Sequence, residues 1–294
     1  NKDKSVVSRE IRRNADARSG EYKDDLAHRK YLKRQAYKAK ARTFTPEVEA
    51  YVRDKLRLKY SPEQIAGAAK TNGDNCVSHE RIYQFIWQDK RKKGTLYLDL
   101  RNRGRRYKKR SVIYDKRGTI PNRTDISLRP PEVEQRERFG DLEIDLIIGK
   151  NHKNAILTIN DRATGLAKLC KLTGKDAEQL AVATIDCLKD WKPYLHTITS
   201  DNGKEFSSHQ MIATELNIDF FFAKPFASWQ RGSNENYNRL VRQYIPKKVD
   251  FDYVTHDYVK YVEQQLNNRP RKRFGYLSPN QIVSKVWNTL EKSG

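Results

Sequence analysis

Apolar residues recur at helical spacing in the first third of the chain. An apolar stripe at every fourth position from Val48 to Leu56 predicts a helix opened by the Thr-Pro-Glu at 45–47. The Ser-Pro-Glu at 61–63 repeats this start signal and predicts a short helix that ends near residue 69. After a turn, Ser78 caps a third helix with an apolar inner face. This order is typical of a helix-turn-helix module, although an ordinary three-helix bundle fits the pattern equally well.

Two further helices are predicted ahead of this module. Residues 5–14 predict a short polar helix with Ser5 as its cap, and residues 21–42 predict a basic helix. Nothing upstream supports the first of these helices, and residue 1 is not Met. We therefore infer that a leading segment preceded residue 1.

From Asp141 onward the pattern changes to short apolar runs separated by turn residues. Leu142–Gly149, Ala155–Asn160 and Leu166–Leu172 predict three strands of an antiparallel meander. Further elements are predicted as helices over 176–191, 233–244, 253–268 and 278–290 and as strands over 197–199 and 218–222. This alternation of strands and helices predicts an α/β domain with a mixed sheet.

Composition narrows the class of protein. A chain of 294 residues is long enough for two or three domains, and no apolar run approaches the ~18–20 residues that span a bilayer. Cys76, Cys170 and Cys187 are widely spaced and include no Cys-x-x-Cys pair, and no histidine falls at ligand spacing with a cysteine. A disulfide framework and a zinc finger are therefore disfavoured, and a reducing compartment is expected.

The positive charge lies mainly in the first half of the chain. The formal net charge is +22; residues 1–140 hold 37 Lys and Arg against 19 Asp and Glu, a net of +18, which leaves +4 for the rest. Seven of the ten residues at 101–110 are basic, in a segment too polar to build a core. This distribution indicates a DNA-binding region ahead of a catalytic one, whereas a purely solubilising role would not require so large an excess.

Three acidic residues alternate along the first predicted strand, so their side chains share one face. They are Asp141, Glu143 and Asp145, while Ile144 and Leu146 are expected to pack the opposite face. The alternation does not choose among the three. Asp145 is predicted to be the most interior, where a charge is costly unless it is paired or bound to metal.

Two more carboxylates lie at the ends of predicted elements. Asp201 precedes Asn-Gly, which also suits a hairpin turn, and Glu235 opens a helix, which also suits simple capping. Counted from Asp145, 55 and then 33 residues separate the three positions. Carboxylates that converge within a basic protein are typical of a Mg²⁺ or Mn²⁺ site that cuts and joins phosphodiesters.

The motifs that surround these acids resemble a known family. GDLEIDLIIG at 140–149, TSDNGKEF at 199–206, the long AKPFASWQRGSNENYNRLVRQYIPK at 223–247 and QQLNNRPRKRFGYLSP at 264–279 closely resemble the DDE transposases of the bacterial insertion-sequence-thirty family. The resemblance extends over nearly the whole chain. It implies a ribonuclease-H-like fold, an α/β domain with a mixed five-stranded sheet, preceded by all-α helix-turn-helix modules.

The resemblance also implies a domain order. Residues 1–42 are expected to hold the remnant of a first helix-turn-helix and a basic helical linker, and 43–90 the second helix-turn-helix. Residues 91–134 are expected to form a basic linker, and 135–294 the catalytic domain with C-terminal helices. The protein is expected in the bacterial cytoplasm, associated with the nucleoid.

The implied activity is that of a transposase, which binds terminal inverted repeats, cleaves the element's ends and joins the 3′-hydroxyl to target DNA. Two Mg²⁺ (or Mn²⁺) ions ~3.5–4 Å apart would be bridged by Asp145 and flanked by Asp201 and Glu235, which are the implied catalytic and metal-binding residues. Pairing two double-stranded DNA ends implies at least a homodimer. The alternatives are a DNA-binding repressor with an inactive nuclease-like domain and a retroviral-type integrase.

Other residues are candidates for contacts around this chemistry. Glu143, Asn202, Asn234 and Asn236 are expected to orient the metal ligands, although turn and cap roles also fit them. Trp229 is a candidate to stack on a displaced base, with buried packing as its alternative. The remaining candidates for DNA contacts are basic or polar residues, each with a plain surface role as its alternative: Ser8, Arg9, Arg12, Arg13, Ser78, His79, Arg81, Arg101, Arg103, Arg105, Arg106, Lys108, Lys109, Arg110, Lys224, Arg231 and Arg242.

Overall fold

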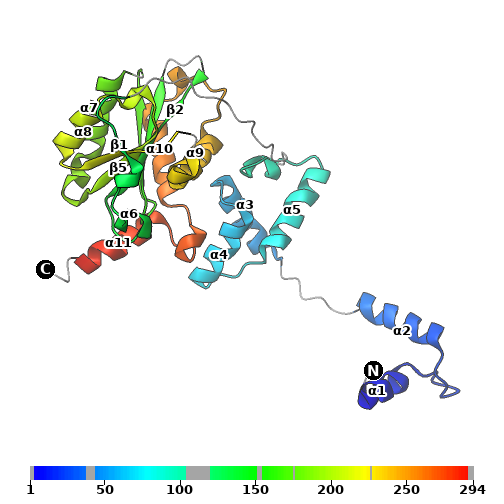
Figure 1. The fold of residues 1–294 in the computed structure, drawn as a ribbon. Helices are drawn as coiled ribbons and strands as arrows, with labels where there is room; N and C mark the ends of the chain where they lie inside the picture. Colours follow the sequence, from blue (N-terminus) through cyan, green and yellow to red (C-terminus); the bar gives the residue numbers. More distant parts are fainter. Residues whose placement is uncertain are drawn as a thin grey trace. The chain divides into compact units, whose positions relative to one another are not determined.

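Two short helices form the first of two units in the chain (Figure 1). The computed structural model describes residues 3–37, 44–103, 120–150, 154–174, 176–225 and 227–290. Helix α1 (Lys4–Asn14) and helix α2 (Asp24–Tyr37) belong to unit 1–45, where Arg34 Nη2 donates to Asn14 Oδ1 at 2.7 Å. The cap of α1 is Asp3, whose carboxylate accepts from the Ser5 amide, rather than Ser5 as predicted. A carboxylate is the better acceptor at a helix N-terminus.

The second unit, 46–294, opens with the predicted helical triplet. Helices α3 (Pro46–Arg57), α4 (Pro62–Asn72) and α5 (His79–Arg91) are followed by the short helix η1 (Leu96–Asp99). Ser61 and Gln64 form a capping box on α4, and Ser78 caps α5. The helices share a core whose members are fully buried: Val52, Leu56, Ile65, Ile82 and Ile86.

A six-stranded mixed sheet forms the centre of the second unit, in the order β1-β6-β5-β2-β3-β4. Strands β2 (Asp141–Ile148), β3 (Ala155–Asp161) and β4 (Ala167–Leu172) form the predicted antiparallel meander. Strands β5 (Thr197–Ser200) and β6 (Asp219–Phe222) run parallel to β2. This arrangement confirms the ribonuclease-H-like α/β fold. The sheet has one more strand than predicted, because β1 (Thr124–Asp125) pairs with β6 inside the segment expected to be linker.

Helices cover both faces of this sheet (Figure 1). Helices α7 (Ala177–Leu188) and α8 (His209–Leu216) pack on the face that carries Leu142, Ile144 and Leu146. Helices α9 (Gly232–Tyr244) and α10 (His256–Asn267) pack on the other face, against Ile147. The alternation along β2 thus fills one core with its apolar residues and turns its acids toward α9.

Eight further elements lie in the described ranges, most of them short. They are α6 (Glu132–Gln135), α11 (Pro279–Leu290), η2 (Ile126–Leu128), η4 (Lys189–Tyr194), η5 (Lys204–Phe206), η6 (Ser228–Arg231), η7 (Phe251–Tyr253) and η8 (Lys272–Phe274). None of the helices within the described ranges has the length and apolar character needed to cross a membrane. Cys76, Cys170 and Cys187 are free thiols.

The helical triplet α3–α5 contacts the segment that joins α10 to α11. Gln64 Nε2 donates to the Pro270 carbonyl at 2.6 Å, and Arg269 Nε donates to Gln64 Oε1 at 3.0 Å. Lys272 Nζ lies 2.6 Å from Glu63 Oε1. Arg269 is 2% exposed, so this contact is made by a buried side chain rather than by surface charges alone.

Candidate active site

Two of the three acids on β2 are neutralised by internal partners. Asp141 accepts from Arg138 Nε at 2.7 Å and from Thr197 Oγ1 at 2.8 Å. Glu143 Oε1 accepts from Arg162 Nη1 at 2.8 Å, and Glu143 Oε2 accepts from the Asn234 amide at 2.8 Å. Both acids are buried and each of their oxygens accepts a hydrogen bond from within the fold, so we assign them structural roles.

Asp145 is the accessible acid of the three. Its side chain is 23% exposed, so the prediction that it is the most interior was wrong. The error arose because strand position does not report what covers each face. Burial nevertheless raises the pKa of Asp145 to about 6, while Arg231 lowers it and Asp201 raises it further. Asn238 Nδ2 donates to Asp145 Oδ2 at 3.0 Å and the Leu146 amide donates to Oδ1 at 2.8 Å, which fixes the carboxylate.

Asp201 lies beside Asp145 because β5 is the parallel neighbour of β2. The hairpin alternative for the Asp-Asn-Gly at 201–203 was wrong, since β5 and β6 are parallel strands separated by α8. The turn is instead closed by Asp201 Oδ1, which accepts from the Gly203 amide at 3.0 Å. The pairing of β2 with β5 ends at Glu143 and Thr199, and Asp145 and Asp201 each lie two residues beyond that pair, so the two carboxylates are well placed to share one ligand.

One guanidinium joins the two aspartates. Arg231 Nη1 lies 3.2 Å from Asp145 Oδ2, and Arg231 Nη2 lies 3.5 Å from Asp201 Oδ2. Arg231 is therefore the cation that these carboxylates share in this structure. Its Nε is buried without a hydrogen-bond partner, so the guanidinium is incompletely satisfied there.

Glu235 lies in the first turn of α9 and does not join this pair. Its side chain is 45% exposed and lies 3.7 Å from Arg239, one turn along the helix. Within the described part of the chain, no three His, Cys, Asp or Glu side chains gather closely enough to hold a metal ion. The structure thus brings Asp145 and Asp201 together, and Glu235 is positioned only through its helix.

Three contacts fix the start of that helix on the sheet. Besides the bond from the Asn234 amide to Glu143, Thr158 Oγ1 on β3 lies 3.2 Å from Asn234 Oδ1 and donates to Asn238 Oδ1 at 2.8 Å. Asn238 was not identified from the sequence. The signal was its position four residues after Asn234, which places both amides on one face of a helix. Glu143 and Asn234 hold α9 against the strand of Asp145.

The other predicted orienting residues lie elsewhere. Asn202 Nδ2 donates to the Ala223 carbonyl, and its Oδ1 accepts from Arg123 Nη1 at 2.5 Å. Asn236 Oδ1 accepts from Arg101 Nη2 at 3.0 Å. Neither amide is bonded to Asp145 or Glu235, so Asn202 links β5 to the segment after β6 and Asn236 holds Arg101.

The candidate DNA contacts lie in several separate parts of the chain. Ser8, Arg9, Arg12 and Arg13 are exposed on α1, and Ser78, His79 and Arg81 form the N-terminal end of α5, where Ser78 is the cap. Lys224 and Trp229 are exposed near the acids, Trp229 at 76%, so buried packing of Trp229 was wrong. Arg242 Nη2 donates to the Ile148 carbonyl at 2.7 Å, and Arg103 is exposed after η1. Arg105, Arg106, Lys108, Lys109 and Arg110 lie outside the described residues.

Sequence similarity to known proteins shows the family of the chain. It is 53% identical over 286 residues to the transposase for insertion sequence element IS4351 of Bacteroides fragilis, covering 97% of this chain and 88% of the relative. The transposase for element IS1086 of Cupriavidus metallidurans is 32% identical over 96% of this chain and 86% of its own length. Transposase InsI for element IS30A of Escherichia coli is 30% identical over 97% of this chain and 76% of its own length. The chain belongs to the IS30 family of transposases.

The catalytic core domain of BIV integrase aligns with a TM-score of 0.40 and 18% identity, over 51% of this chain and 97% of that one. No protein-family model matches the chain.

In this IS30-family transposase the candidate site contains the pair Asp145 and Asp201, and Glu235 lies on the neighbouring helix α9. Three residues that were not identified from the sequence form an ion network around the buried acid Glu143. Arg162 donates to both Glu143 and Glu134, and Glu134 also pairs with Arg129. These residues come from different elements, and nothing in their local sequence indicates that they meet.

Proposed function

We propose that this transposase cleaves phosphodiester bonds at the ends of its insertion sequence and joins the 3′-hydroxyl to target DNA, with Mg²⁺ or Mn²⁺ held by Asp145, Asp201 and Glu235. The observation that supports this best is the guanidinium of Arg231 shared by Asp145 and Asp201. Two carboxylates that converge on one cation form an oxygen-only donor set of the kind hard divalent ions prefer.

The surroundings of the pair fit a metal ion in place of the guanidinium. Arg231 leaves its Nε unpaired in its present position, so its displacement toward a DNA phosphate does not break a complete hydrogen-bond set. Glu235 is held by a surface ion pair with Arg239, and such a pair contributes at most ~1 kcal/mol. Its side chain is therefore free to turn toward the aspartates. When bound, the metal activates the attacking oxygen and stabilises the leaving one.

The chain's own residues supply the geometry of this reaction. Asn238 orients the carboxylate of Asp145, and Glu143 anchors the first turn of α9, which carries Glu235. Arg231 keeps two adjacent carboxylates compatible with each other before substrate arrives. Because hydrogen bonds already fix Asp145 and the start of α9, only the side chains of Arg231 and Glu235 need to move when metal and DNA bind.

The other parts of the proposal concern DNA. The helix-turn-helix module binds the terminal inverted repeats, and the basic segment at 101–110 neutralises phosphates. Since two ends must be held together, the active form is at least a homodimer. A repressor with an inactive nuclease-like domain is the competing function, and it requires no metal.

Metal dependence separates the two functions. The protein is mixed with a labelled duplex that carries the inverted repeats flanking its gene, in Mg²⁺, Mn²⁺ or EDTA. We expect nicking with either metal and none in EDTA, and Asp201→Asn should remove nicking together with Mn²⁺ binding measured by calorimetry. Glu215→Gln is the control, since Glu215 is an exposed acid in a 3.8 Å surface pair with Lys192. Nicking in EDTA, or none under any condition, refutes the proposal.

A further inference from the structure

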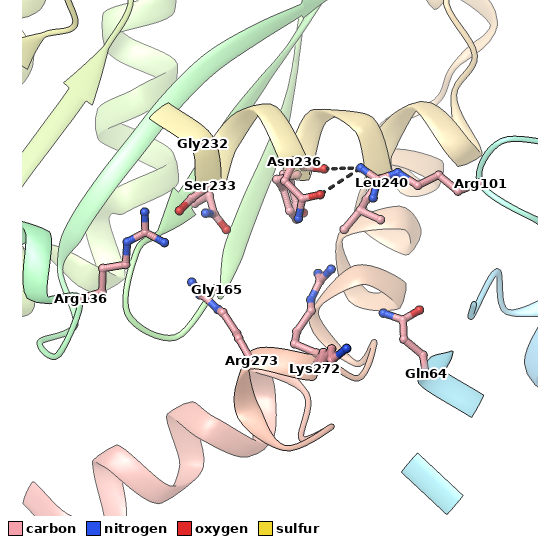
Figure 2. A pocket seen from close by; sticks show the side chains of 13 residues that line it. Gln64, Arg101, Arg136, Gly165, Gly232, Ser233, Asn236, Leu240, Lys272 and Arg273 are labelled. Carbon is pink, nitrogen blue, oxygen red and sulfur yellow. Dashed lines mark hydrogen bonds between the residues drawn. The ribbon is translucent and has the colours of Figure 1, made fainter. Parts of the chain in front are cut away.

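A cavity of about 460 Å³ lies between the start of α9, the segment before α11 and the helix-turn-helix module (Figure 2). Five of its thirteen described lining residues are cationic, and none of the thirteen is acidic. The cations are Arg101, Arg136, Arg271, Lys272 and Arg273. They come from three separate parts of the chain, so the fold brings this charge together.

Only part of this charge is compensated. Lys272 is paired with Glu63 of α4, whereas Arg101, Arg271 and Arg273 donate to the carbonyls of Asn236, Leu266 and Ala163. Burial is the main reason that the pKa of Arg271 is lowered to about 10. The positive charges of Arg273 and Arg101 contribute to this lowering. A cavity in which cations repel one another gains stability from an anion.

Two hydroxyl groups at the cavity have no partner. Ser233 and Tyr237 line it from α9, and both hydroxyl oxygens are buried without a hydrogen bond among the described residues. Buried polar atoms are nearly always satisfied, so an orphan pair indicates a missing ligand that accepts hydrogen bonds. Gly232 and Ser233 also present the first turn of α9, where the helix dipole favours negative charge.

We propose that this cavity binds a phosphate group of the DNA backbone. The inference rests on the proposed function for the source of that phosphate. Ser233, Asn236, Tyr237 and Leu240 line the cavity at helical spacing, while Asn234 contacts Thr158 of the sheet and Asn238 contacts Asp145. One helix therefore grips a phosphate on one side and supports the carboxylates on another.

This placement assigns the phosphate site a positioning role. Glu235 lies two residues after Ser233 and one before Asn236, so a phosphate held there fixes the strand relative to the helix that bears the glutamate. Gln64 and Arg101 complete the wall from the helix-turn-helix side. The site thus joins the DNA-reading module to the catalytic domain through the substrate's backbone.

The unpaired hydroxyl of Ser233 provides the sharpest test. Ser233→Ala removes a buried group that has no partner in the free protein, so the melting temperature should stay the same or rise. Affinity for the terminal-repeat duplex, measured by fluorescence anisotropy in EDTA, should fall about tenfold, the lower range for a hydrogen bond to a charged group. A residue with only a structural role would give the opposite result, with lower stability and unchanged affinity.

Charge removal gives an independent measurement. Arg136→Gln/Arg273→Gln should weaken duplex binding and reduce the slope of log affinity against log salt by about 1 per lost phosphate contact. The matched control is Lys189→Gln/Lys192→Gln, which removes the same charge from exposed positions on the other side of the sheet and should leave the slope unchanged. Equal slopes in the two double variants overturn the proposal.

Inorganic phosphate distinguishes the two sources of the anion. If it binds the wild type and is lost in Arg136→Gln/Arg273→Gln while duplex affinity is unchanged, the cavity takes free phosphate and the DNA assignment is wrong. All of these measurements are made in EDTA, without cleavage. If the wild type does not nick DNA but the cavity variants bind the duplex more weakly, the proposed function is refuted and the phosphate site stands. If the wild type nicks DNA but the cavity variants bind the duplex as tightly as it does, the phosphate site alone is refuted.

Discussion

The buried carboxylate of Glu143 should be far more important for stability than the exposed carboxylate of Glu134, although both pair with Arg162. Arg162 Nη1 donates to Glu143 Oε1 at 2.8 Å and Nη2 donates to Glu134 Oε2 at 2.9 Å. The side chains of Glu143 and Arg162 are 0% and 1% exposed, whereas that of Glu134 is 64% exposed. Water can replace only the second interaction.

Glu143→Gln leaves one buried donor without an acceptor. Both oxygens of Glu143 accept hydrogen bonds, one from Arg162 and one from the Asn234 amide, but a glutamine side chain has a single acceptor oxygen. The amide nitrogen of the introduced glutamine must then face one of these two donors. The guanidinium of Arg162 also loses its buried negative partner. Breaking a buried ion pair costs about 3–5 kcal/mol, whereas loss of an exposed pair costs at most ~1 kcal/mol.

Urea and thermal unfolding followed by circular dichroism test this difference. For a domain of this size about 1 kcal/mol lowers the melting temperature by ~2–4 °C, so Glu143→Gln should lower it by roughly 6 °C or more. Glu134→Gln is the control: Glu134 also pairs with Arg129, but its 64% exposed side chain lets water replace a lost bond, so the shift should be smaller, less than about 4 °C. Equal, small shifts for both variants would refute the view that Glu143 fixes α9 through a buried ion network.

Other variants test the site and the fold. Arg231→Gln should raise Mn²⁺ affinity in the DNA-free protein by roughly tenfold in calorimetry, because a competing positive charge is gone; unchanged affinity would contradict this. Trp229→Ala should alter the free energy of unfolding by less than about 0.5 kcal/mol yet weaken binding of single-stranded DNA by the ~1–3 kcal/mol of a base stack, so unaltered binding counts against stacking. Burial raises the pKa of Asp161 to about 6, so the folded state binds this proton more tightly than the unfolded state. The contribution of Asp161 to stability is thus greatest at low pH and falls as pH rises from about 4 to 6; Asp161→Asn should remove this part of the pH dependence in urea titrations, and identical profiles would exclude it.

The meander and the helices on its two faces were predictable because their apolar residues follow periods of two and of three to four. Strand β1 and helix α8 were not predicted. Strand β1 has two residues, and α8 has eight, so neither carries a periodic pattern long enough to detect. Their existence depends on the pairing of β1 with β6 and on the packing of α8 under the sheet.

The site was only partly predictable for a similar reason. Alternation showed that Asp141, Glu143 and Asp145 share a face, but not which of them is neutralised from within. That depends on Arg138 and Arg162, which reach the strand from a preceding segment and from a later turn. No local sequence pattern indicates the cationic cavity either. Its side chains come together only because helices α3–α5 contact the segment before α11.

The most direct test of the central claim is strand nicking by Glu235→Gln. Asp145 and Asp201 already share a cation, so Glu235 is the residue whose catalytic role rests on its turning toward them. The substrate is a duplex with the flanking inverted repeats in Mg²⁺, and duplex affinity is measured alongside, with Glu215→Gln as control. We predict that Glu235→Gln does not nick the duplex. Its affinity for the duplex should stay within about twofold of the wild type, a difference in binding free energy of about 0.4 kcal/mol or less. Nicking at the wild-type rate by Glu235→Gln would contradict the account.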